Sequence, residues 1–172
     1  GHSSGANYAL WAAPQTDNLQ SVIPHEPAAP PEADVRAVLK ETMEKTIALI
    51  EQGQNEEALT MVLNDFVEIA QDELTTIRSS PVWDGHVDTF HRTLLPEAKV
   101  AGEFDWWDLT PFEDLSIPTL LPVGSESSHK RMAEQLHEMM PDSRLAILEG
   151  YGHFVHLVAP DRYTDVVLSF IN

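Results

Sequence analysis

The sequence contains no cysteine and carries little positive charge. Without cysteine it can form no disulfide and no thiolate metal site, and it cannot use a cysteine nucleophile. Ten Lys and Arg residues stand against 28 Asp and Glu residues, and the formal net charge of -18 repels both nucleic acid phosphates and anionic membrane surfaces. The sequence also lacks a run of 18 apolar residues. We therefore expect neither nucleic acid nor a membrane as a partner, and we expect a cytoplasmic location.

The chain nevertheless has enough apolar sequence for one domain with a sizeable core, because 42% of its 172 residues are hydrophobic. A proline-rich and alanine-rich stretch, "PHEPAAPPEAD", separates a short first part from a long helical one. Apolar residues at three-residue and four-residue spacing continue from there to about residue 95. We predict a core in two pieces, residues 1–32 and 116–172, with a helical insertion at residues 33–115.

The predicted elements of the core are of the α/β class. A helix over Ala6–Ala13 follows a glycine-rich turn, and the apolar run Leu19–His25 predicts a short strand. The C-terminal piece predicts two buried strands, a helix between them and a closing helix, in the order 118–124, 129–140, 144–150 and 160–171. Strands that alternate with helices in this way favour parallel pairing.

The insertion predicts three amphipathic helices followed by an irregular aromatic stretch. The first carries an apolar face that begins at Val35 and Val38 and ends before Gly53, the second follows Asn55, and the third follows Ser80. In the aromatic stretch, Phe104, Trp106, Trp107 and Phe112 could line an apolar ligand pocket or simply pack in a core.

The first five residues, "GHSSG", place Ser3 in a G-x-S-x-G pattern. This spacing is typical of a sharp strand-to-helix turn, in which the glycines remove Cβ atoms that would clash and the serine is exposed. The hydroxyl then lies at a helix N-terminus, where the backbone N–H of Ser4 is the expected donor to a developing oxyanion. The alternative is that the five residues are an ordinary linker or the remnant of a tag.

A serine nucleophile needs a histidine base, and "YGHFVHLVAP" offers His153 and His156. His153 is preferred because it follows two glycines that allow a close backbone approach, while His156 fits a structural role better. An acid that holds the imidazole must come from a strand end. Glu126 in "VGSES" and Glu26 in "IPHEP" both satisfy that condition, and either could instead be a solvated loop carboxylate.

The order of elbow, helix, strand, helical insertion, strand, helix, strand, histidine loop and closing helix resembles the second half of an α/β-hydrolase, from the nucleophile elbow onward. The segments "GHSSGANYAL" and "IPTLLPVGSES…PDSRLAILEGYGHFVHLVAPDRYTDVVLSFI" carry the resemblance. It implies that Ser3 is the nucleophile, that His153 is the base and that residues 33 to about 115 are a variable cap. It also implies that the strands before the elbow are missing, so that the chain alone is an inactive fragment.

The commonest family pattern has an aspartate three residues after the glycine that ends the penultimate strand, and here that position is Ser127. The acid is then either Glu126, one residue away, or Glu26, as in family members that place the acid after the elbow helix. The segment "HEP" resembles this second arrangement. We therefore favour Glu26. A serine at the elbow fits acyl transfer rather than chemistry that needs a carboxylate nucleophile. The resemblance implies a small ester or acyl substrate with no cofactor and no metal, and the alternative is a non-catalytic ligand-binding protein.

Overall fold

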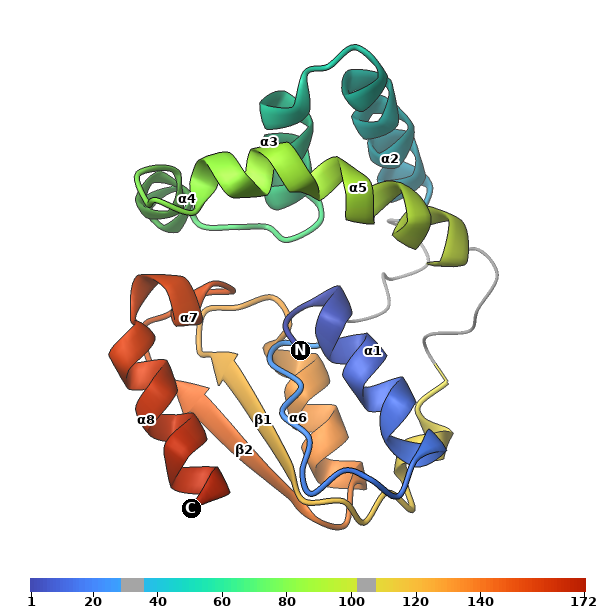
Figure 1. Cartoon of the computed structure of the whole chain (residues 1–172), viewed down its shortest axis with the longest axis vertical. Helices are drawn as coiled ribbons and strands as arrows, with labels where there is room; N and C mark the ends of the chain where they lie inside the picture. Colours follow the sequence, from blue (N-terminus) through green and yellow to red (C-terminus); the bar gives the residue numbers. More distant parts are fainter. Residues whose placement is uncertain (29–35, 102–107) are drawn as a thin grey trace. The chain divides into compact units, whose positions relative to one another are not determined.

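The computed structural model describes residues 1–28, 36–101 and 108–172. The chain divides into two compact units (Figure 1). Unit 1 combines Gly1–Pro30 with Trp106–Asn172, and unit 2 is Pro31–Asp105. The sequence-based division placed the insertion at residues 33–115, and the unit boundary before β1 lies earlier than that, at Asp105.

Unit 1 contains the α/β elements. In chain order these are α1 (Ser4–Ala12), η1 (Ala13–Gln15), η2 (Thr110–Phe112), β1 (Thr119–Gly124), α6 (Lys130–Met139), β2 (Ser143–Leu148), α7 (Val155–Val158) and α8 (Pro160–Ile171). The predicted order of helix, strand, helix, strand and closing helix is therefore confirmed. The single turn α7, inside the stretch predicted as a loop, is the one helical element that the sequence patterns did not indicate in this C-terminal piece.

Strands β1 and β2 form a parallel pair, with Thr119 opposite Ser143 and Gly124 opposite Leu148. Figure 1 shows α8 on one side of the two strands and α1 and α6 on the other. This arrangement buries β1 on both faces, which explains its continuous apolar sequence, and Leu120, Leu121 and Val123 are fully buried.

The predicted strand Leu19–His25 is only partly correct. The segment forms two isolated bridges instead of a continuous ladder, Val22 with Thr119 on β1 and His25 with His2 before α1. Pro24 lies between the bridged positions and has no N–H to donate, which limits regular pairing. The segment still runs between the start of α1 and β1, because the N–H of His25 bonds to the carbonyl of Gly1 and that of Glu26 to the carbonyl of Pro122.

The core of unit 1 lies between α1, α6 and the adjacent face of the strands. It is built from apolar side chains of α1, η2, β1 and α6 and from the loops beside them: Leu10, Ala13, Val22, Phe112, Leu115, Leu121, Met132, Leu136 and Met140. Phe112 is thus a core residue. The expectations for Phe104, Trp106 and Trp107 lie outside the described residues.

Unit 2 is helical, with α2 (Arg36–Glu51), α3 (Asn55–Asp65), α4 (Gln71–Arg78) and α5 (Trp83–Ala101). The first and third predicted helices are confirmed, and α2 ends just before Gly53, which has a positive φ of 74°. The predicted apolar face of α2 is wrong at Val38, which is 61% exposed. The second predicted helix was expected to continue to Ala70, but α3 ends at Asp65, and the chain turns through Glu68, at φ 54°. The helix α4 was not predicted.

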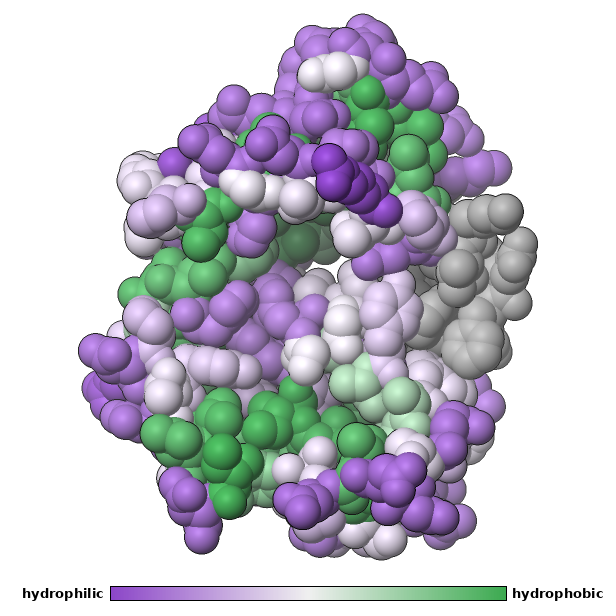
Figure 2. All heavy atoms as spheres, viewed as in Figure 1, coloured by the Kyte–Doolittle hydropathy of each residue, from purple (hydrophilic) through white to green (hydrophobic). Residues whose placement is uncertain are grey.

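Figure 2 shows hydrophobic residues among the hydrophilic ones on the face in view. Exposed apolar residues include Ile147 on β2 and Leu168 and Ile171 on α8. No helix within the described ranges is both long enough and apolar enough to cross a lipid bilayer.

Candidate active site

Ser3 stands in a strained backbone conformation at the start of α1. Its φ of 55° and ψ of -124° are uncommon for any residue with a side chain, and such strain persists where the surrounding structure enforces it. The turn is held by two hydrogen bonds, from the N–H of Ser3 to the carbonyl of His25 and from the N–H of Gly5 to the carbonyl of His2. The local geometry is therefore that of a sharp turn into a helix, which is incompatible with a loose N-terminal linker.

The two glycines of the motif differ in what they permit. A Cβ at Gly1 would lie 2.0 Å from the carbonyl oxygen of Gly5, so the expected steric reason for glycine applies there. Among the described residues, a Cβ added at Gly5 would meet nothing within 4 Å. Steric clash therefore does not explain the glycine at that position. Only the first glycine of the pattern is explained by close packing.

Ser4 is the first residue of α1. In the hydrogen-bonding pattern of the described chain, the neighbouring N–H groups of Ser3, Gly5 and Ala6 have backbone acceptors, and that of Ser4 has none. An N–H group in the first turn of a helix has no intrahelical partner. It is therefore available to an anion that lies beside the Ser3 side chain.

Glu26 and His153 form a buried pair. Nδ1–H of His153 donates to Oε2 of Glu26 over 2.6 Å, and the two side chains are 3% and 0% exposed, respectively. Glu26 also has a positive φ of 52°, so both Ser3 and Glu26 occupy left-handed backbone conformations that favour glycine. Of the two carboxylates that the sequence left open, the structure brings Glu26 to His153.

The carboxylate of Glu26 accepts two further hydrogen bonds. The N–H of Gly124 at the end of β1 donates to Oε1 over 2.7 Å, and the hydroxyl of Ser127 donates to Oε2 over 2.5 Å. Burial raises the pKa of Glu26, and the hydrogen bonds from Ser127 and Gly124 oppose that rise. Three donors thus satisfy a carboxylate that lies away from solvent.

His153 is held as a neutral imidazole. Burial, together with the smaller effect of the nearby His156, lowers the pKa of His153 to about 3. With the Nδ1 proton directed at Glu26, the lone pair of the neutral ring is on Nε2. This is the protonation state in which a histidine can accept a proton from a hydroxyl group.

His2, the residue before Ser3, contacts His153. Nε2–H of His2 donates to the backbone carbonyl of His153 over 3.0 Å, and the two rings lie 4.4 Å apart between centroids. The hydrogen bonds of the described residues do not include one between the Ser3 hydroxyl and His153. In unliganded enzymes such bonds are often long and tighten only with substrate bound.

The other sequence candidates lie elsewhere. Glu126 is exposed, and its backbone N–H bonds to the carbonyl of Tyr151. His156 is half-buried on α7, with its ring 4.3 Å from that of His2. Neither side chain takes the place of Glu26 or His153 in the buried pair.

Sequence reasoning missed one polar contact of this site. Ser127 was noted only as a departure from a pattern, yet its hydroxyl contacts the Glu26 carboxylate and also accepts the N–H of His129 over 3.1 Å. The available signal was its position three residues after Gly124, because the chain at that position lies next to the loop that carries His153.

No family model matches the sequence, whereas individual proteins and solved structures do resemble it. A proline iminopeptidase of Saccharolobus solfataricus is 30% identical over 78 residues, which are 44% of this chain and 25% of that protein. An α/β-hydrolase structure from Sphaerobacter thermophilus is 25% identical with a TM-score of 0.78, over 100% of this chain and 66% of that one. A carboxylesterase structure from Bacillus subtilis is 15% identical with a TM-score of 0.65, over 99% of this chain and 58% of that one.

The fold and these likenesses together place the chain in the α/β-hydrolase fold superfamily. It spans a quarter of the length of the iminopeptidase and less than two thirds of the hydrolase structures.

Proposed function

We propose that the protein is a serine hydrolase that cleaves a small ester or a related acyl compound through an acyl-Ser3 intermediate. The observation that carries the proposal is the buried hydrogen bond between Glu26 and the Nδ1 atom of His153. A carboxylate in this position fixes the tautomer of the histidine and stabilises its charged form during proton transfer. The strained turn at Ser3 supplies a serine at a helix N-terminus in the same unit.

In the first half of the proposed reaction, the Ser3 Oγ attacks the acyl carbonyl carbon while Nε2 of His153 accepts the hydroxyl proton. The N–H of Ser4 stabilises the oxyanion of the tetrahedral intermediate. The bond to the leaving group then breaks, and the proton on His153 passes to that group. Glu26 remains ionised throughout and accepts the Nδ1–H of the imidazolium.

In the second half, a water molecule attacks the acyl-Ser3 ester while His153 takes one of its protons. The new tetrahedral intermediate collapses to release the carboxylic acid, and the proton returns to the Ser3 oxygen. Both halves use groups of this chain and water. The similarity to an iminopeptidase and a carboxylesterase supports acyl chemistry, and the substrate class of a small ester is our proposal.

The test is covalent labelling of the full-length protein, expressed from its natural reading frame, with a fluorophosphonate probe. We expect labelling of the wild type, none in Ser3→Ala and very little in His153→Ala. The matched controls are Ser169→Ala and His137→Ala, because both side chains are exposed and lie in unit 1 away from the pair. Absence of labelling in a well-folded wild type, or labelling that persists in Ser3→Ala, overturns the proposal and favours a ligand-binding role.

A further inference from the structure

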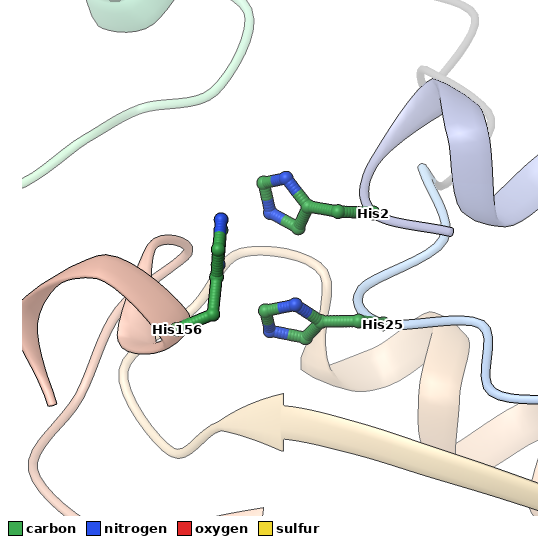
Figure 3. A group of neighbouring side chains, drawn as sticks. All are labelled: His2, His25 and His156. Carbon is green, nitrogen blue, oxygen red and sulfur yellow. The ribbon is translucent and has the colours of Figure 1, made fainter. Parts of the chain in front are cut away.

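Three histidines meet beside the buried Glu26 and His153 pair (Figure 3). His2, His25 and His156 each offer a ring nitrogen, and these three nitrogens all lie within 4.8 Å of one another. The rings also contact one another directly, with centroid distances of 4.6 Å for His2 and His25, 4.3 Å for His2 and His156 and 5.1 Å for His25 and His156. We call these three residues the histidine cluster.

His25 gives an independent sign that something is bound there. Its side chain is 1% exposed and in contact with the rings of both other members, yet within the described residues its Nε2 atom has no hydrogen-bond partner. Buried side-chain polar atoms nearly always have a partner in protein or ligand, because leaving one unsatisfied is costly. A lone pair or a proton of His25 therefore faces the cluster without a protein group to meet it.

We propose that His2, His25 and His156 bind a divalent transition-metal ion, with Zn²⁺ as the best match. Imidazole is a preferred ligand of zinc, and three histidines with one open position form a known type of four-coordinate zinc site. Because the chain has no cysteine, histidine is its remaining nitrogen or sulfur side chain that commonly binds zinc. The formal net charge of -18 raises the local concentration of cations around the protein.

The geometry requires only a small adjustment to bind the ion. Zinc–nitrogen bonds of about 2.1 Å in a tetrahedral arrangement place the ligand nitrogens about 3.4 Å apart. The three nitrogens lie within 4.8 Å of one another, so each pair must approach by at most about 1.4 Å to reach that spacing.

The ion would join the three chain segments that supply the proposed catalytic groups. His2 directly precedes Ser3, His25 directly precedes Glu26, and His156 is three residues beyond His153. His2 is also tied to the histidine loop by its hydrogen bond to the carbonyl of His153. We assign the ion a positioning role, because it would fix the relative places of these segments without contacting substrate.

The experiment measures metal binding directly and needs no substrate, so its outcome is separate from that of the proposed hydrolase activity. The full-length protein, produced without a histidine tag, is stripped with a chelator, dialysed against Zn²⁺ and analysed for bound metal by mass spectrometry. We expect one equivalent per chain and a higher unfolding temperature with Zn²⁺. Replacement by Co²⁺ is expected to give the intense visible absorption of a tetrahedral site.

The variants His25→Asn and His156→Asn are expected to lose both the bound equivalent and the Zn²⁺-dependent rise in unfolding temperature. His137→Asn, an exposed histidine of the same unit, is expected to retain both. His156 is half-buried, so its variant keeps the test usable if His25→Asn fails to fold. A folded wild type that retains no zinc, or retention that is the same in His156→Asn as in the wild type, overturns the proposal.

Discussion

Glu26 and His153 are separated by 127 positions in the sequence, and their side chains meet at 2.6 Å in the interior of unit 1. Glu26 comes from the segment that runs between the start of α1 and β1, whereas His153 comes from the loop after β2. The whole of unit 2 lies between them in the sequence. The contact therefore depends on the parallel arrangement of the elements of unit 1.

Replacing Glu26 by Gln tests the assignment of the acid. The amide keeps the shape of the side chain but cannot stabilise an imidazolium, and in serine hydrolases a change of this type lowers kcat by about 10⁴. We expect a loss of that order for Glu26→Gln, measured as turnover of a chromogenic short-chain ester by the full-length protein. The exposed Glu126→Gln is the control and should retain wild-type turnover; a large loss there, with Glu26→Gln active, contradicts the assignment.

Replacing Ser127 by Ala tests whether its hydroxyl positions the Glu26 carboxylate. A hydrogen bond to a charged group contributes about 1.5–3 kcal/mol of stabilisation. Without this bond the Glu26 carboxylate is expected to orient His153 less well, and part of the lost free energy is then seen in kcat. We expect kcat to fall by about 10-fold with KM nearly unchanged.

Ser127→Thr, which retains the hydroxyl, serves as the conservative partner of that variant. It should recover most of the lost kcat, since the donor to Glu26 is restored. If Ser127→Ala and Ser127→Thr lose the same activity, the hydroxyl has no positioning role.

Replacing Gly124 by Ala should destabilise the fold at the histidine loop. An added Cβ would lie 2.2 Å from the carbonyl oxygen of Tyr151 and 2.4 Å from that of Gly152, so the loop that carries His153 must move. Overpacking of this kind costs about 1–3 kcal/mol in the free energy of unfolding. Urea denaturation measures the cost.

Gly85→Ala is the matched control, because Gly85 lies inside α5 and a Cβ added there would meet nothing within 4 Å. Alanine has the higher helix propensity by about 1 kcal/mol, so this variant should be as stable as the wild type or more stable. Equal stability of the two glycine variants would show that the loop does not pack against Gly124.

His129 should make the stability of the protein depend on acidic pH. Burial lowers the pKa of His129 to about 4, so between pH 6.5 and about 4 the unfolded state binds a proton that the folded state does not. The free energy of unfolding therefore decreases as the pH falls below 6.5, and His129 contributes about 1.4 kcal/mol to this decrease per pH unit. The variant His129→Gln lacks this contribution to the pH dependence of stability, and it has every other titrating group in common with the wild type.

The measured quantity is the difference in the free energy of unfolding between the wild type and His129→Gln. The difference should shift in favour of the variant as the pH is lowered from 7 to 5. A difference that stays constant over this range would mean that His129 titrates alike in both states.

Local patterns were sufficient for the elements that are buried in regular structure. The run "TLLPVG" predicted β1 because a strand covered on both faces needs continuous apolar residues, and Gly53 predicted the end of α2. The patterns failed where backbone geometry is irregular. A positive φ at Glu68 separates α3 from α4, and glutamate gives no sequence sign of that conformation.

The residue types of the candidate site were predictable, and the family resemblance also favoured Glu26 as the partner of His153. Local patterns alone left Glu26 and Glu126 open, because the contact between Glu26 and the end of β1 joins positions 98 residues apart. The histidine cluster was also not evident, since His2, His25 and His156 come from three distant segments and show no ligand spacing within any one of them. Such contacts are set by tertiary structure, which local periodicity does not encode.

The division of the chain has a consequence for recombination. Every residue of the Glu26 and His153 pair, with Ser3, Ser4, Ser127 and the histidine cluster, belongs to unit 1, while unit 2 enters and leaves that unit at two points in the sequence. Unit 2 is a continuous stretch of the sequence, whereas unit 1 is assembled from both ends of it. An exchange of unit 2 between related sequences would therefore replace none of the residues of the candidate site.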